Sequence, residues 1–133
     1  MILYILRGVP GCGKSTLAKT LAPPECICEA DDFHMKNGVY EFKRENVGAA
    51  HLACRAKVRE LMGAKAPRIV VSNTNVTSAD VNIYLQIAEK NGYQSFVMVV
   101  ENRHDGKDSH GVPEETLRSM EKSLNRSGSI KLR

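Results

Sequence analysis

Runs of apolar residues alternate with segments of helical periodicity along most of the chain. The apolar runs are short and continuous, a pattern typical of strands that are buried on both faces of a parallel sheet. Four such runs are present, at residues 2–6, 26–30, 68–72 and 95–101. Together with the helical segments between them, they predict an α/β fold built from βα units.

Four helices are predicted between and after these strands. The first opens at Lys14 and ends before a pair of prolines, because proline cannot continue a helix. The second covers about residues 46–62, where apolar residues recur at helical spacing. The third begins at a capping-box pattern that starts with Thr77, and the fourth begins after Pro113.

The predicted second helix carries a basic face opposite its apolar face. His51, Arg55 and Arg59 are four residues apart and therefore form one stripe. Such a stripe is either a solvated helix face or one wall of a groove that follows phosphates. The formal net charge of +4 adds only weak support for an anionic partner. The sequence leaves both interpretations open.

Length and composition fit one compact domain over residues 1–133. The chain has 133 residues, of which 42% are hydrophobic and 26% charged, as in ordinary globular domains. The first apolar run is too short for a signal peptide or a membrane span. The four cysteines of the chain form no CxxC pair, which argues against a zinc site and against a disulfide framework. We therefore expect a cytoplasmic protein, or one acting in the host cytoplasm if a phage encodes it.

A phosphate-binding motif joins the first strand to the first helix. The pattern GxxxxGK[ST] runs from Gly8 to Ser15, between a predicted strand and a predicted helix. Glycines let backbone N–H groups curl around phosphates, Lys14 can reach the β- and γ-phosphates, and the Ser15 hydroxyl can ligate Mg²⁺. The motif predicts ATP, or another nucleoside triphosphate, with Mg²⁺ as cofactors. The residues expected to contact the nucleotide are Gly8, Gly11, Cys12, Gly13, Lys14, Ser15 and Thr16.

Acidic residues follow the second predicted strand instead of the third. Motors and GTPases of the P-loop class hold Mg²⁺ with a carboxylate after a later strand, yet residues 72–75 contain none. Asp31 and Asp32 stand at the carboxyl end of the second strand, where ligands bind in open α/β folds. One aspartate can cap a turn, and the other can act as a general base for an acceptor hydroxyl.

The chain resembles the kinase domain of bacteriophage polynucleotide 5′-kinases and related small P-loop kinases. Four segments carry the resemblance, in the same order and over about residues 2–124. They are Gly-Val-Pro-Gly-Cys-Gly-Lys-Ser-Thr at 8–16, Ala-Asp-Asp-Phe at 30–33, Ser-Asn-Thr-Asn at 72–75, and Val-Pro-Glu-Glu-Thr-Leu-Arg-Ser-Met at 112–120.

The resemblance implies a P-loop kinase-type, four-stranded parallel sheet with helices on its faces. It implies that Asp31 is the catalytic base and that residues 102–111 form a lid, followed later by a basic tail at 127–133. In the lid, Arg103 and Lys107 stand where the family carries arginines that stabilise the transferring phosphoryl group. The residues expected around the acceptor are Asp32, His34, Asn73 and Asn75, with His34 and Asn73 replacing an arginine and an aspartate of the family.

The activity expected from the sequence is phosphoryl transfer from ATP to the 5′-hydroxyl of a polynucleotide, DNA or RNA. The nucleic acid 5′ end is then the substrate partner, and neither a membrane nor an obligate protein partner is evident. Two alternatives stay open: a kinase for a nucleoside, nucleotide or other small metabolite, and an ATP-binding regulatory protein with slow hydrolysis.

Overall fold

The computed structural model describes residues 1–10, 12–36, 39–40, 44–75, 77–101, 115–116, 118–120 and 122. For residues 34–36, 39–40 and 44 it describes the backbone alone. Gly11, the lid with Arg103 and Lys107, and the basic tail lie outside the described residues.

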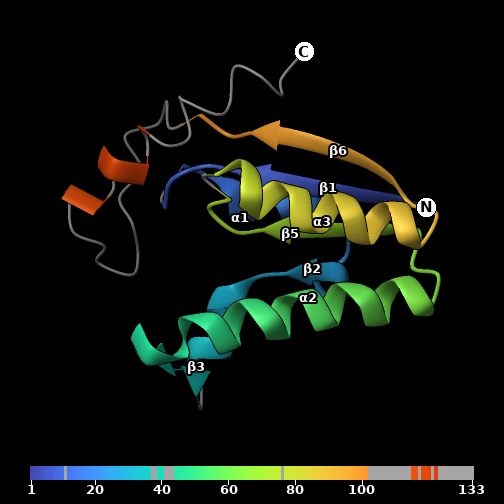
Figure 1. Ribbon diagram of the computed structural model, residues 1–133, viewed down its shortest axis with the longest axis horizontal. Coiled ribbons are helices and arrows are strands. Elements are labelled where there is room, and N and C mark those ends of the chain that lie inside the picture. The colour runs from blue at the N-terminus through green and yellow to red at the C-terminus, as the bar shows by residue number, and fades with distance from the viewer. Residues whose placement is uncertain are drawn as a thin grey trace.

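A four-stranded sheet forms the centre of the fold (Figure 1). Its order is β2-β5-β1-β6, and every neighbouring pair is parallel. The strands are β1 (Ile2–Arg7), β2 (Ile27–Cys28), β5 (Arg68–Ser72) and β6 (Gln94–Val99). The predicted fold class, a four-stranded parallel sheet with flanking helices, is confirmed. The P-loop strand β1 lies inside the sheet, between β5 and β6.

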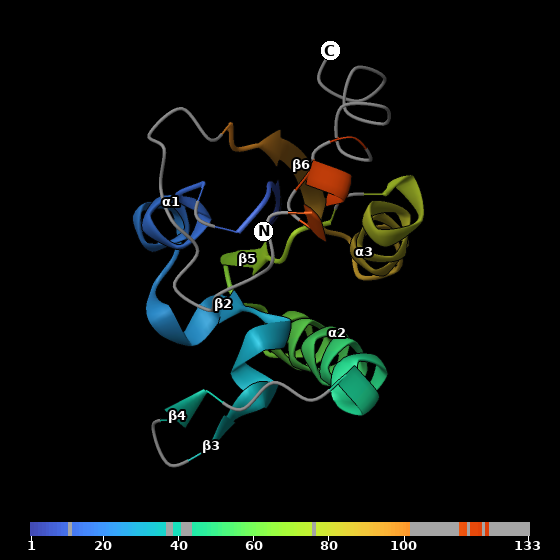
Figure 2. The ribbon, with the colours of Figure 1, turned by 90° about the vertical axis from the view of Figure 1, so that its left-hand side faces the viewer.

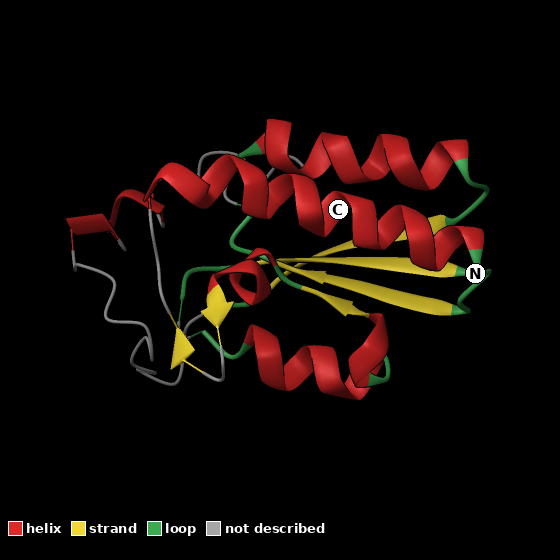
Figure 3. Cartoon of the chain, turned by 90° about the horizontal axis from the view of Figure 1, so that it is seen from below, coloured by secondary structure: helices red, strands yellow, loops and turns green. Residues whose placement is uncertain are grey.

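Helices cover both faces of this sheet. Helices α2 (Val47–Gly63) and α3 (Ser78–Lys90) lie on one face, and α1 (Lys14–Leu21) lies on the other (Figure 3). Successive strand residues point to opposite faces, so Leu3 and Ile5 pack in the larger core under α2 and α3, while Leu6 packs with α1. All three side chains are completely buried. Two-sided burial explains the continuous apolar runs of β1 and β5, whereas β6 at the edge of the sheet has no fully buried residue.

The helix ends follow the local signals in the sequence. Thr77 accepts a hydrogen bond from Asp80 N at 3.2 Å, and the Asp80 carboxylate accepts one from Thr77 N at 3.3 Å. The predicted capping box at the start of α3 is therefore confirmed. Helix α1 ends at Leu21, before the proline pair, also as predicted. Beyond residue 113, helical backbone is present at residues 115–116, 118–120 and 122.

The second strand is shorter than the sequence predicts. A strand over residues 26–30 was expected, but β2 contains only Ile27 and Cys28 and is flanked by two 3₁₀ helices, η1 (Pro24–Cys26) and η2 (Ala30–His34). Two hydrogen bonds explain this. Ala30 N donates to the side-chain oxygen of Asn73 at 2.7 Å. This N–H, at the start of η2, is therefore bonded to a side chain and not to a neighbouring strand. Lys57 Nζ donates to Ile27 O at 2.8 Å and thereby satisfies a carbonyl of this edge strand.

A small antiparallel hairpin of β3 (Met35–Lys36) and β4 (Val39–Tyr40) was not anticipated. Figure 2 shows it projecting from the β2 side of the fold, away from β6. A third 3₁₀ helix, η3 (Arg44–Asn46), then leads into α2. Within the described part of the chain, no helix is long and apolar enough to cross a membrane.

Candidate functional site

The loop between β1 and α1 is fixed at the carboxyl edge of the sheet. Gly8 N donates to Thr74 O at 3.0 Å, so the first loop residue is bonded to the segment after β5. On the other side, Val100 N donates to Arg7 O at 2.7 Å, which joins the end of β1 to the end of β6. The loop therefore starts from a backbone position that both neighbouring strands hold.

Gly8 lacks a side chain for a steric reason. A Cβ built at this position would lie 2.6 Å from Cys12 Sγ and 2.8 Å from Val100 O. Both distances are shorter than real Cβ contacts allow. The sulfur that occupies this space belongs to a cysteine that is only 1% exposed. Cys12 thus packs inside the loop as a small apolar residue, and its sulfur fills the space beside Gly8.

We expect Gly8→Ala to lower the free energy of unfolding by about 1–3 kcal/mol, because the added methyl group overpacks the base of the loop. Nucleotide binding should weaken at the same time, since Cys12 must move. Thermal unfolding and titration with ATP measure the two effects. Gly48→Ala is the matched control: a Cβ at Gly48 in α2 has open space around it, so that variant should bind ATP like the wild type and be at least as stable. Wild-type behaviour of Gly8→Ala would contradict this account of the loop.

Gly13 supplies the turn into α1. Its φ of +102° lies in the left-handed region that side chains disfavour, and it occupies the N-cap position of the helix. No side chain caps this helix end. Ser15 and Thr16, in the first turn, are exposed. The backbone N–H groups at the start of α1 and the positive end of its dipole are therefore available to an anion.

The Lys14 ammonium folds back over the loop. Its Nζ donates to Gly8 O at 2.8 Å and to Val9 O at 3.1 Å, and it lies 3.7 Å from Cys12 Sγ. Burial lowers the pKa of Lys14, while Cys12 and two acidic residues that follow β2, Asp31 and Glu29, oppose this shift. Among the described residues, the partners of the ammonium are two carbonyl oxygens and the Cys12 sulfur, which phosphate oxygens can replace.

Three carboxylates gather beside this loop, after β2. Ser15 Oγ donates to Glu29 Oε1 at 3.4 Å, the long end of the hydrogen-bond range. Burial raises the pKa of Glu29, Asp32 and Asp31 raise it further, and the Ser15 hydroxyl opposes the rise. An open hollow of about 280 Å³ lies here, and the residues that line it are Ser15, Lys19, Pro24, Ile27, Glu29 and Asp32.

Sequence reasoning overlooked Glu29. The available signal was its place directly after the second apolar run, two residues before Asp31. The predicted strand over residues 26–30 includes Glu29, and a residue within a buried strand is not expected in a site. Its Ser15 contact depends on how α1 packs beside β2, which no local pattern specifies.

Asp31 and Asp32 lie in η2 and are both exposed. Asp32 is exposed, but partial burial of its carboxyl group raises its pKa. Lys57 on α2 lowers this pKa, and Asp31 raises it. Asp32 lines the open hollow together with Ser15 and Glu29, and Asp31 counteracts the lowering of the Lys14 pKa. Of His34, the structure describes the backbone alone.

The structure gives the two asparagines after β5 internal partners. Asn73 is buried and bonds Ala30 N, with Cys54 Sγ and Tyr84 Oη each 3.5 Å from its Nδ2. Asn75 is 4% exposed, and its side-chain Nδ2 donates to Leu6 O at 2.8 Å. Its backbone carbonyl accepts from Arg7 Nε at 2.7 Å. Both side chains hold the surrounding backbone, Asn73 at the start of η2 and Asn75 at the base of the phosphate loop. The expectation that they contact the acceptor stays a prediction.

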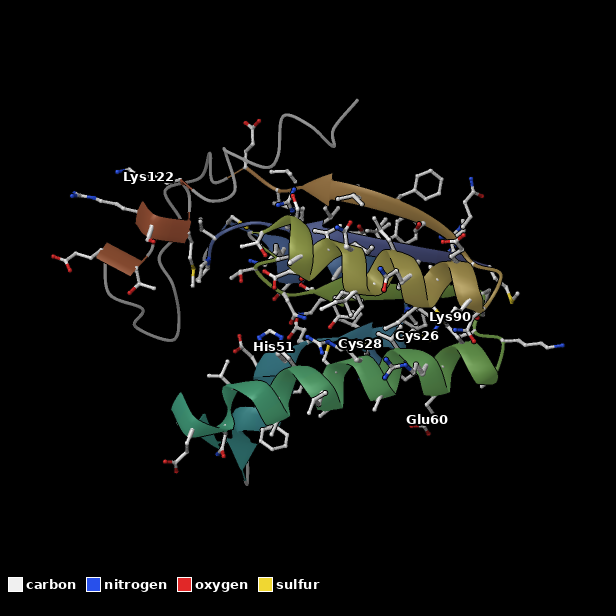
Figure 4. All side chains as sticks on the ribbon, viewed as in Figure 1. Cys26, Cys28, His51, Glu60, Lys90 and Lys122 are labelled. Carbon is white, nitrogen blue, oxygen red and sulfur yellow. The ribbon has the colours of Figure 1, made fainter. Side chains whose placement is uncertain are left out.

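The basic stripe of α2 is only partly solvated. His51 and Arg55 are half-buried and Arg59 is exposed. Arg55 Nε is buried without a hydrogen-bond partner among the described residues. Figure 4 shows His51 near the end of the molecule at which the strands end, whereas Glu60 and Lys90 lie at the opposite end. The stripe therefore begins close to the carboxylates and runs away from them.

The cysteines do not form a site in the described structure. All four are free and buried. Burial raises the pKa of Cys28 to about 12 and also raises that of Cys26 and Cys54. Among the described residues, no group of three or more histidine, cysteine or acidic side chains has a metal-binding arrangement.

Comparison with known proteins gives three similarities. A family model for the AAA domain matches residues 3–126. NEDD4-binding protein 2 of Homo sapiens is 34% identical over 97 residues, which are 71% of this chain and 6% of that protein. The chain thus spans a small part of the length of this relative. A cysteine-to-alanine mutant of the Mycobacterium tuberculosis APS kinase CysC matches with a TM-score of 0.46 and 14% identity, over 92% of this chain and 96% of that one.

Proposed function

The chain belongs to the AAA domain family, and we propose that it is an ATP- and Mg²⁺-dependent kinase that phosphorylates the 5′-hydroxyl of a polynucleotide. The observation that carries this proposal is the pairing of a P-loop with an exposed carboxylate, Asp31, whose charge acts on Lys14. Phosphoryl transfer to a hydroxyl needs a phosphate cradle and a nearby base. The loop from Gly8 to Ser15 and Asp31 lie at the same edge of the sheet, which supports the assignment of these two roles to them.

The nucleotide side fits the triphosphate of ATP. The side-chain-free position at Gly8, the left-handed Gly13 and the uncapped start of α1 leave backbone N–H groups for phosphate oxygens. Lys14 exchanges its carbonyl partners for the β- and γ-phosphates and stabilises the charge of the transferring group. Ser15, exposed in the first turn of α1, would hold Mg²⁺, which neutralises phosphate charge when bound.

On the acceptor side, Asp31 accepts the proton of the attacking hydroxyl. Its position in η2, outside the end of β2, leaves it open to solvent and so to the end of a large acceptor. Arg55 and Arg59 on α2 are basic residues that can follow a phosphate backbone. Arg103 and Lys107 of the lid and Lys131 and Arg133 of the tail, which lie outside the described residues, complete the basic set.

The test is transfer of labelled γ-phosphate from ATP to a panel of acceptors. A 5′-hydroxyl oligonucleotide, a nucleoside 3′-monophosphate and a free nucleoside are compared at two salt concentrations. We expect kcat/KM to be highest for the oligonucleotide and to fall steeply with salt, because each neutralised backbone phosphate releases counterions. Adding EDTA should abolish transfer.

Other outcomes select the alternatives. A preference for the free nucleoside without salt dependence would contradict the polynucleotide proposal and favour a small-metabolite kinase. Hydrolysis of ATP that no acceptor accelerates would favour an ATP-binding regulatory protein.

A further inference from the structure

The end of β5 lacks the carboxylate that motors and GTPases use near Mg²⁺. Ser72 is the last residue of β5, and Asn73 follows it. Ser72 is 7% exposed, and its Oγ is buried without a hydrogen-bond partner among the described residues. A buried hydroxyl without a partner is costly, because its lost hydration is not replaced. The Ser72 hydroxyl lowers the pKa of Glu29, against the rise that burial causes.

Glu29 lies between two hydroxyl groups, one from each side of the phosphate loop. Ser15 Oγ, at the start of α1, donates to its carboxylate at 3.4 Å, and Ser72 approaches from β5. Asp32 and Asp31 add negative charge beside this carboxylate, and the Lys14 ammonium is a positive charge that interacts with it. No basic side chain of the described residues forms an ion pair with Glu29, so negative charge accumulates beside Ser15. Divalent cations such as Mg²⁺ bind sites of this kind, made of carboxylate and hydroxyl oxygens.

We infer that Glu29 supplies the carboxylate of the Mg²⁺ site from β2, in place of the one missing after β5, and acts there together with Ser15. The inference rests on the proposed function, since Mg²⁺ enters with the nucleotide. Asp31 is then left for the acceptor hydroxyl, and the two carboxylates have separate tasks. Glu29 orients the metal at the phosphates, and Ser72 orients Glu29.

The experiment measures metal binding directly, without catalysis. Mn²⁺ is titrated into the protein with a non-hydrolysable ATP analogue, and free Mn²⁺ is followed by electron paramagnetic resonance. We expect Glu29→Gln to weaken Mn²⁺ binding by about 10- to 100-fold, the range seen when metal-site partners are removed. Affinity for the analogue in EDTA should not fall, because the substitution removes a negative charge beside the phosphates.

Two further variants make the result specific. Glu25→Gln removes an exposed carboxylate in η1, near the site but outside it, and should bind Mn²⁺ like the wild type. Ser72→Ala should weaken Mn²⁺ binding less than Glu29→Gln while keeping the fold, as checked by thermal unfolding. Equal Mn²⁺ affinity of wild type and Glu29→Gln would overturn the inference on Glu29 and leave the proposed function standing. Failure of the wild type to bind the analogue under any condition would overturn the proposed function, and the inference with it.

Discussion

Lys14→Met should reduce phosphoryl transfer by about 10³-fold, the loss typical of removing one preorganised donor to developing charge. Methionine keeps the length of the side chain, so the change is chiefly the loss of the ammonium. Lys14 contributes hydrogen bonds to Gly8 O and Val9 O, both within the loop, and none to the sheet core. Far-ultraviolet circular dichroism should therefore be unchanged, and single-turnover transfer assays measure the loss.

The matched control is Lys90→Met, at the exposed end of α3 opposite the site (Figure 4). It should transfer phosphate at the wild-type rate. If Lys14→Met kept the wild-type kcat while folded, the loop would not be the phosphate site.

Asp31→Asn should lower kcat by about 10²- to 10⁴-fold, the usual contribution of a general base. The amide keeps the size of the side chain but cannot take the proton of the acceptor hydroxyl. ATP affinity should hardly change, because the phosphates contact the loop and α1 instead of η2. Rates with saturating acceptor and the dissociation constant of ATP, measured separately, distinguish these effects.

Asp32→Asn serves as the comparison, since Asp32 is the neighbouring exposed carboxylate in η2. It should cost much less activity than Asp31→Asn. The reverse ranking would assign the base to Asp32, and a parallel loss of ATP binding in Asp31→Asn would make that residue part of the nucleotide site.

Features that depend on local sequence could be predicted well. Buried strands β1 and β5, the capping box at Thr77 and the end of α1 follow from apolar runs, side-chain caps and proline geometry. The sequence also predicts that Lys14 and Asp31 lie at the same edge of the sheet, because parallel strands have their carboxyl ends on one side. These features need no knowledge of which distant side chains meet.

Features that depend on distant partners could not be predicted. The shortened β2 results from Asn73, 43 residues away from the N–H that it bonds. The internal role of Asn75 requires its contact with Leu6 O, and the Glu29 contact requires α1 and β2 to be packed. The residue types of Asn73 and Asn75 suggested acceptor contacts, and only the folded chain shows the internal groups that they bond. Glu29 lies within the predicted second strand, and only the folded chain brings it to Ser15.

The two-residue strand β2 also affects how the molecule opens. Free energies of local opening rise with backbone pairing and buried contacts, and β2 pairs only with β5, at Ile27 and Cys28. The segment that follows it carries Glu29 and Asp31, whereas the phosphate loop continues from β1, which is paired along its length on both sides. Amide hydrogens of the carboxylate segment therefore exchange through smaller fluctuations than those of β1. We expect the phosphate loop to be the more rigid half of the proposed site, and the carboxylate segment to adjust to an incoming acceptor without unfolding of the sheet.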